Sequence, residues 1–115
     1  MRMVENLRTD QDLWYLNSQF GITGWPVPAG KTPLAGIPVT DPEYSKGFYY
    51  CQQVIQLMEN VYFDLDLEAN YEHPAFSGWL QQFRRWKQSP MFQHTYMKTA
   101  DTFSYLFCSF YERRI

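Results

Sequence analysis

The residues best suited to chemistry are basic, and they lie within the sequence FRRWK. This segment comprises Phe83, Arg84, Arg85, Trp86 and Lys87. Arginine beside tryptophan can stack on bases, contact phosphate groups or bind an acidic protein surface. We therefore treat the whole segment as a candidate interaction surface.

Acidic residues precede this segment at Asp64, Asp66, Glu68 and Glu72. The simpler interpretation is that the acidic and basic clusters face each other or water, because most charge runs are solvated faces. The alternative is a helical domain that binds a polyanionic surface, membrane headgroups or nucleic acid, through its three cations. Three cations are a small footprint for nucleic acid, which argues against that partner. Peripheral membrane contact would also need the rings of Trp79, Phe83 and Trp86 at the interface.

Patterns for metal binding and catalysis are weak. Helical di-iron sites use Glu three residues before His, but Asn70 precedes His73 and Met91 precedes His94 at that spacing. Nucleophile-elbow and phosphate-loop motifs are absent from the sequence. Glu59 and Asp66 would be about 10 Å apart on one helix face, but such pairs are usually surface groups. We expect no catalytic residue, no metal and no cofactor, and therefore a non-enzymatic protein.

Composition limits the class of protein. The chain has 115 residues, a formal charge of −2 and 19% aromatic residues. This length suits one domain, and the many rings require a core. The N-terminal sequence MRMVENLRTDQD has no apolar signal core, and no window of 18 residues is uninterruptedly apolar. We expect a cytoplasmic protein without a transmembrane segment, in which Cys51 and Cys108 are free buried thiols.

The element that positions everything else is a central helix expected over residues 42–67. Asp41 can cap its start and Pro42 suits its first position. Asp66 would fall inside the apolar arc, so regular helix should end near Leu65. At helical spacing, ten apolar residues share half of the circumference: Phe48, Tyr50, Cys51, Val54, Ile55, Leu57, Met58, Val61, Tyr62 and Leu65.

Three further helices are expected, over residues 9–20, 74–88 and 90–113. His73-Pro74 and Ser89-Pro90 provide the starts of the last two. Residues 21–41 hold four prolines and four glycines, which indicates an irregular arm with Trp25 as its anchor. The last helix should bury one side: Phe92, Tyr96, Ala100, Phe103, Leu106, Phe107, Phe110 and Tyr111.

These patterns predict an all-α fold, a small bundle of about four helices with one long central helix and a Pro/Gly-rich arm. Tyr49, Phe63 and Leu67 fall on the otherwise polar side of the central helix, which favours an interface. The expected function is non-enzymatic protein binding or assembly through an aromatic-rich surface and the arm. The expected partner is another protein or a second copy of the chain.

Overall fold

The computed structural model describes Leu16 and residues 42–115. Four α-helices and two 3-10 turns lie within residues 42–115, and no strand does. They are α3 (Glu43–Asp64), η1 (Pro74–Phe76), α4 (Ser77–Lys87), α5 (Pro90–Thr99), η2 (Ala100–Thr102) and α6 (Tyr105–Arg114). The all-α prediction is therefore confirmed. The predicted helix over 9–20 and the arm over 21–41 lie outside the described residues, except for Leu16, which is helical and fully buried.

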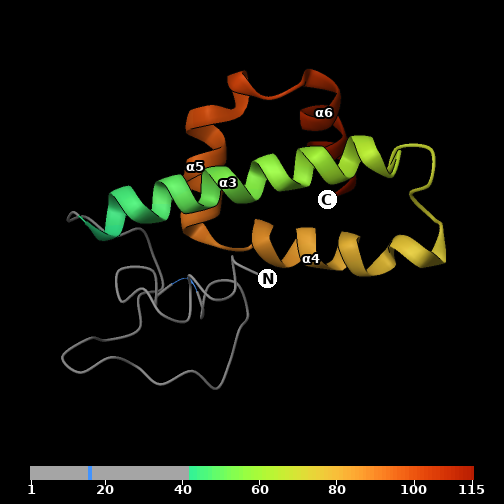
Figure 1. Ribbon diagram of the computed structural model, residues 1–115, viewed down its shortest axis with the longest axis horizontal. Coiled ribbons are helices and arrows are strands. Elements are labelled where there is room, and N and C mark those ends of the chain that lie inside the picture. The colour runs from blue at the N-terminus through green and yellow to red at the C-terminus, as the bar shows by residue number, and fades with distance from the viewer. Residues whose placement is uncertain (1–15, 17–41) are drawn as a thin grey trace, which may run out of the picture.

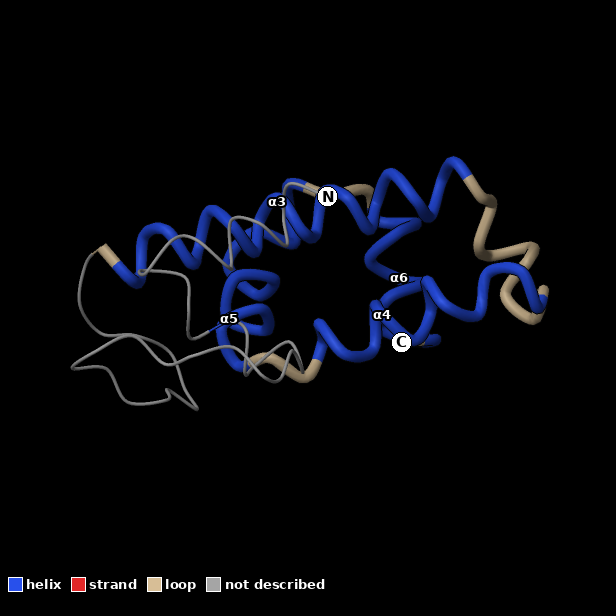
Figure 2. Tube along the Cα trace, turned by 60° about the horizontal axis from the view of Figure 1, so that its bottom comes forward, coloured by secondary structure: helices blue, strands red, loops and turns tan. Residues whose placement is uncertain are grey.

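The four helices pack around one aromatic core. Figure 1 shows α3 and α4 running in opposite directions, with α5 and α6 crossing α3 on the far side. Figure 2 shows the same helices from below, joined by short loops. The core contains residues of all four helices and Leu16, and its largest fully buried side chains include Phe83, Phe92, Phe107 and Phe110.

The apolar face predicted for the central helix is confirmed. Seven of its ten residues are buried, while Phe48, Leu57 and Leu65 are half-buried and pack against the core. Pro42 is the N-cap and not the first helical residue, so the helix begins one residue later than predicted; the Pro42 carbonyl accepts the amide of Lys46 at 3.0 Å.

The end of α3 explains why two residues do not follow the helical pattern. The amide of Leu67 donates to the Tyr62 carbonyl at 3.1 Å and that of Asp66 to the Phe63 carbonyl at 3.3 Å. These two bonds define a Schellman motif, with Asp66 left-handed at φ 48°. The reversal turns Leu67 into the core, where it is fully buried. The prediction of Leu67 as an interface residue is therefore wrong, as is the extension of the helix to residue 67.

The two predicted helix starts, each a capping residue followed by proline, form as expected. His73 caps η1 by accepting the amide of Ala75 on its Nδ1 at 3.1 Å, and Pro74 follows it. Ser89 caps α5 by accepting the amide of Phe92 at 3.2 Å. Each proline stands at the first helical position, where its missing N–H costs no hydrogen bond.

The prediction of a single C-terminal helix over 90–113 is wrong, because the α-helix is interrupted between Thr99 and Tyr105. The Thr102 hydroxyl donates to the Thr99 carbonyl at 2.6 Å, Phe103 is extended, and the Ser104 hydroxyl accepts the amide of Leu106 at 3.2 Å. Hydroxyl side chains that bond to nearby backbone compete with helix in this way. The break also changes the register of the faces, so that Leu106, predicted to be in the core, is 48% exposed.

Candidate protein-interaction site

The outward side of α3 carries two large exposed rings. Tyr49 is 63% exposed and Phe63 is 50% exposed, as the helical pattern predicts. They lie fourteen residues apart on one helix face, so about 21 Å separates them along the axis. The residues between them on this face are uncharged or acidic: Gln52, Gln53, Gln56, Glu59 and Asn60.

A groove of about 350 Å³ opens beside Tyr49. Its α3 wall consists of Tyr49 and three glutamines, and its second wall consists of Thr102 and Phe103. The interruption of the C-terminal helix creates this second wall. In the extended conformation of Phe103 the backbone leaves the helical path, which lays residues 102–103 beside a helix that is about 50 residues earlier in the chain.

A carboxylate fixes the two walls to each other. Glu59 Oε2 accepts the backbone amide of Ser104 at 2.7 Å, and its Oε1 accepts the side-chain amide of Gln56 at 3.0 Å. A carboxylate that accepts a backbone N–H makes a strong, charge-assisted bond. Glu59 is thus a structural tie between α3 and the start of α6. It does not form an acid/base pair with Asp66, because Asp66 lies beyond the end of α3.

The groove offers hydrogen bonds without charge. The Gln56 amide donates to Glu59 and Asn60, so its carbonyl oxygen is left to accept. Thr102 uses its proton on the Thr99 carbonyl and keeps its lone pairs. Together with two aromatic side chains, these groups suit a neutral peptide surface with exposed backbone groups and an apolar side chain.

The FRRWK segment is only partly a surface. Phe83 is fully buried in the core, so its prediction as a contact residue is wrong. Trp86 is half-buried and its ring stacks on that of Phe83, with 6.2 Å between centroids. Both rings serve the core because the helix repeat directs them toward α5 and α6. Arg85 is exposed, while Arg84 and Lys87 are intermediate. Trp25 lies outside the described residues.

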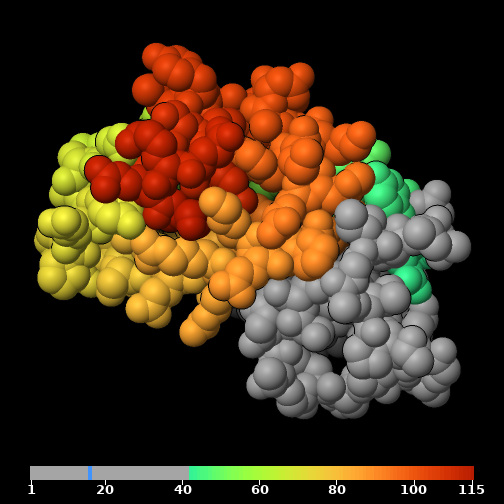
Figure 3. Space-filling model, turned by 180° about the vertical axis from the view of Figure 1, so that it is seen from behind, coloured from blue at the N-terminus to red at the C-terminus, as the bar shows by residue number. Residues whose placement is uncertain are grey.

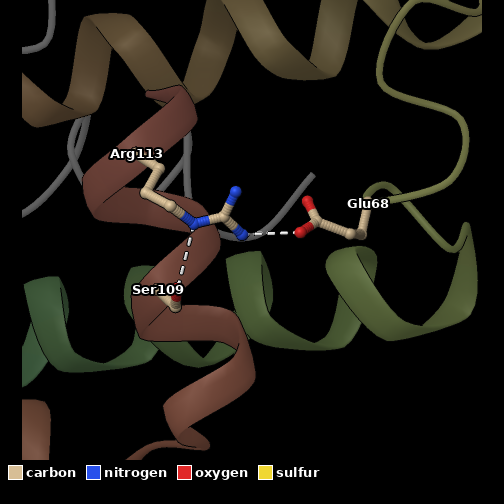
Figure 4. Close-up of polar contacts among 3 residues, drawn as sticks. All are labelled: Glu68, Ser109 and Arg113. Atoms are coloured by element: carbon tan, nitrogen blue, oxygen red, sulfur yellow. Dashed lines mark hydrogen bonds and ion pairs between the residues drawn. The ribbon is translucent and has the colours of Figure 1, made fainter.

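The acidic cluster contacts α6 and not α4. Glu68 forms an ion pair with Arg113, whose Nη2 lies 2.5 Å from the Glu68 carboxylate (Figure 4). The Nε of Arg113 also donates to the Ser109 hydroxyl at 3.0 Å. Asp64 and Glu72 are exposed. The exposure of Asp64 and Glu72 agrees with the expectation that the acidic cluster faces water, but its ion pair is with Arg113 of α6 and not with the FRRWK segment.

The titratable groups of the core are held neutral. Burial raises the pKa of the Cys51 thiol to about 12, and a hydrogen bond with Thr95 opposes part of this shift. Burial likewise raises the pKa of Tyr50 and of Tyr111. A thiol that stays protonated is a poor nucleophile, so Cys51 is a packing residue.

His94 has a structural role. The Nε2 of His94 lies 2.8 Å from the Tyr44 hydroxyl, which links the start of α3 to α5. Within Leu16 and residues 42–115, no three His, Cys, Asp or Glu side chains gather as a metal site would require. No helix among these residues has the length and apolar character needed to cross a membrane.

The sequence pointed to one wall of the groove only. Tyr49 was recognisable as an aromatic residue on a polar helix face. Thr102 and Phe103 were not recognisable, because a continuous helix would have directed Phe103 into the core. The hydroxyl residues at 99, 102 and 104 were the available signal for the break. Comparison of the chain with protein-family models, with curated proteins and with solved structures finds no match.

Proposed function

We propose that this chain is a non-enzymatic protein-binding or assembly module, and that the outward side of α3 together with residues 102–103 is its binding surface. The single observation that carries the proposal is the groove between Tyr49 and Phe103, which is lined by uncharged hydrogen-bonding groups. Interface cores are rich in aromatic residues and poor in charge, and this surface has both properties.

Phe63 extends the same surface. It is half exposed, and its ring lies 4.9 Å from the buried Tyr62 ring, centroid to centroid, in an edge-to-face arrangement. A ring that is braced by the core loses little conformational freedom on binding, which is typical of residues that dominate interface energy. The proposal retains the Pro/Gly arm with Trp25 as a second contributor. It also places the protein in the cytoplasm, which the free thiols of Cys51 and Cys108 support.

Self-association is the most direct test of this binding surface, because it requires only the purified chain. We expect light scattering on a sizing column to give a dimer or larger species across a hundredfold concentration range. The double variant Tyr49→Ser, Phe63→Ser should weaken association by at least about tenfold, since a buried interface ring is worth about 2 kcal/mol or more.

Met97→Ser is the matched control. Met97 is 80% exposed on α5 and is a large apolar residue outside the proposed surface, so this variant should associate like the wild type. Thermal unfolding followed by circular dichroism would show that both variants remain folded. A chain that is monomeric over the whole range, or an equal loss in Met97→Ser, would contradict assembly through this surface.

A further inference from the structure

A second group of residues, separate from the α3 surface, gathers cations from two helices. Arg84, Arg85 and Lys87 lie in the last turns of α4, and Arg113 and Arg114 lie in the last turn of α6. The backbone carbonyl of Arg114 lies 3.4 Å from the Nη2 of Arg84. The end of α6 and α4 are in contact in Figure 3, where α6 is red and α4 yellow-orange. Arg84 and Arg114 therefore meet where the ends of α4 and α6 come together.

Tyr71 holds two of these cations in fixed positions. Its hydroxyl accepts from Arg84 Nη2 at 2.7 Å and donates to the Arg114 carbonyl at 3.2 Å. The guanidinium carbon of Arg114 lies 4.8 Å from the ring centroid and that of Arg84 lies 5.9 Å from it. One ring thus orders two guanidinium groups through cation–π contact, and among the described residues their remaining N–H groups have no acceptor.

The basic residues of this group differ in whether they pair with a carboxylate. Arg113 is neutralised by Glu68, and the Lys87 ammonium lies over the Tyr111 ring at 4.7 Å. Within the described part of the chain, neither Arg84 nor Arg114 forms an ion pair with a carboxylate. Two like charges that are held together on one ring without an acidic partner leave a positive potential that an anion would relieve.

We propose that this surface, formed by Arg84 and Arg114 on the Tyr71 ring with Arg85 and Lys87 in the same last turns of α4, binds an acidic or phosphorylated peptide segment of a protein partner. Paired guanidinium groups match carboxylate and phosphate oxygens with two parallel hydrogen bonds each. Arginine clusters are a recurrent means of recognising phosphorylated and acidic motifs.

The same geometry disfavours other polyanions. Membrane insertion needs exposed apolar rings beside the cations, but Phe83 is fully buried and Trp79 and Trp86 are half-buried against the core. Nucleic acid of useful affinity needs a longer track of cations along its phosphates. Two guanidinium groups ordered on one tyrosine fit a short anionic segment better.

The binding experiment uses the full chain and a fluorescent ten-residue Gly/Ser peptide that contains three phosphoserines. Fluorescence anisotropy should show binding that weakens with added salt and is lost when the phosphoserines are replaced by serine. The variant Arg84→Gln, Arg114→Gln should bind at least about tenfold more weakly, because it removes charge-assisted hydrogen bonds to the phosphate groups.

Two further variants separate charge from structure. Lys46→Gln, Lys98→Gln removes the same charge from exposed residues elsewhere, on α3 and α5, and should bind like the wild type. Arg84→Lys, Arg114→Lys keeps the charge but removes the forked geometry, and should give an intermediate affinity. Unchanged binding by the glutamine variant, or an equal loss in the lysine-to-glutamine control, would overturn the proposal. So would binding to phosphatidylserine vesicles or single-stranded RNA without binding to the phosphopeptide.

The test is independent of the proposed function. Arg84 and Arg114 do not line the groove beside Tyr49. The glutamine variant should therefore self-associate like the wild type, and Tyr49→Ser should not change phosphopeptide binding.

Discussion

Cys51 illustrates how position controls the chemistry of a single residue. Its side chain is fully buried, whereas Cys108 is half-buried, with its Sγ 3.5 Å from the Ala100 carbonyl. Alkylation requires the thiolate and access for the reagent. We therefore expect iodoacetamide at pH 8 to modify Cys108 first and Cys51 only as the protein unfolds. Peptide mapping by mass spectrometry would measure both rates, and equal rates in the native protein would contradict the buried position.

The raised pKa of Cys51 also predicts how stability depends on pH. The thiol ionises near its ordinary value of 9.0 in the unfolded chain, but only near 12 in the folded protein. Between these values the unfolded state binds fewer protons than the folded state, so the free energy of unfolding falls as pH rises. Buried Tyr50 and Tyr111, whose ordinary pKa is 10.0, add to the fall above pH 10.

Urea unfolding from pH 8 to 10 would measure this dependence. Cys51→Ala should lower stability at every pH because it leaves a small cavity, but its slope between pH 9 and 10 should be shallower than that of the wild type. Identical slopes would show that the thiol does not titrate differently on folding. The slope is the informative quantity, since it is unaffected by a constant packing loss.

At the scale of the element, the end of α3 depends on one strained residue. Asp66 adopts a left-handed conformation, with φ 48°, at the position where most Schellman motifs have glycine. Asp66→Gly should remove this strain and stabilise the protein by up to about 1 kcal/mol. Asp64→Gly is the control, because Asp64 is the last helical residue of α3. Glycine at this helical position should lower the free energy of unfolding by about 0.5–1 kcal/mol. Denaturant midpoints of both variants would measure these changes, and destabilisation by Asp66→Gly would contradict the proposed strain at Asp66.

The break between α5 and α6 is the second feature at this scale. Its local causes are the hydroxyl groups of Thr102 and Ser104, which bond to nearby backbone. Its long-range cause is Glu59, which binds the Ser104 amide from a different helix. Local and distant contacts therefore favour the same interruption, and the groove beside Tyr49 exists because of it.

At the scale of the whole molecule, Leu16 shows that the core extends beyond residues 42–115. Leu16 is fully buried and belongs to the same cluster as the residues of α3 to α6. Leu16→Ala should therefore lower the free energy of unfolding by about 2–5 kcal/mol. Leu106→Ala, at a residue 48% exposed, should cost much less. Chemical denaturation of both variants would test this, and equal losses would contradict a core role for Leu16.

Local and periodic features could be determined from the sequence alone. The apolar face of α3 follows from helical spacing, and the starts of η1 and α5 follow from His73-Pro74 and Ser89-Pro90. The exposure of Tyr49 and Phe63 follows from the same spacing. These features depend on residues within one or two turns of each other, so their spacing in the chain is sufficient to predict them.

Only the tertiary structure decided the features that join distant segments. It turned Leu67 inward after the left-handed Asp66 and interrupted the predicted C-terminal helix. It also placed Phe103 beside Tyr49 and Arg114 beside Arg84. Each of these outcomes depends on a contact between helices or on a change of helical register at a break, and neither is encoded in the periodicity of one segment.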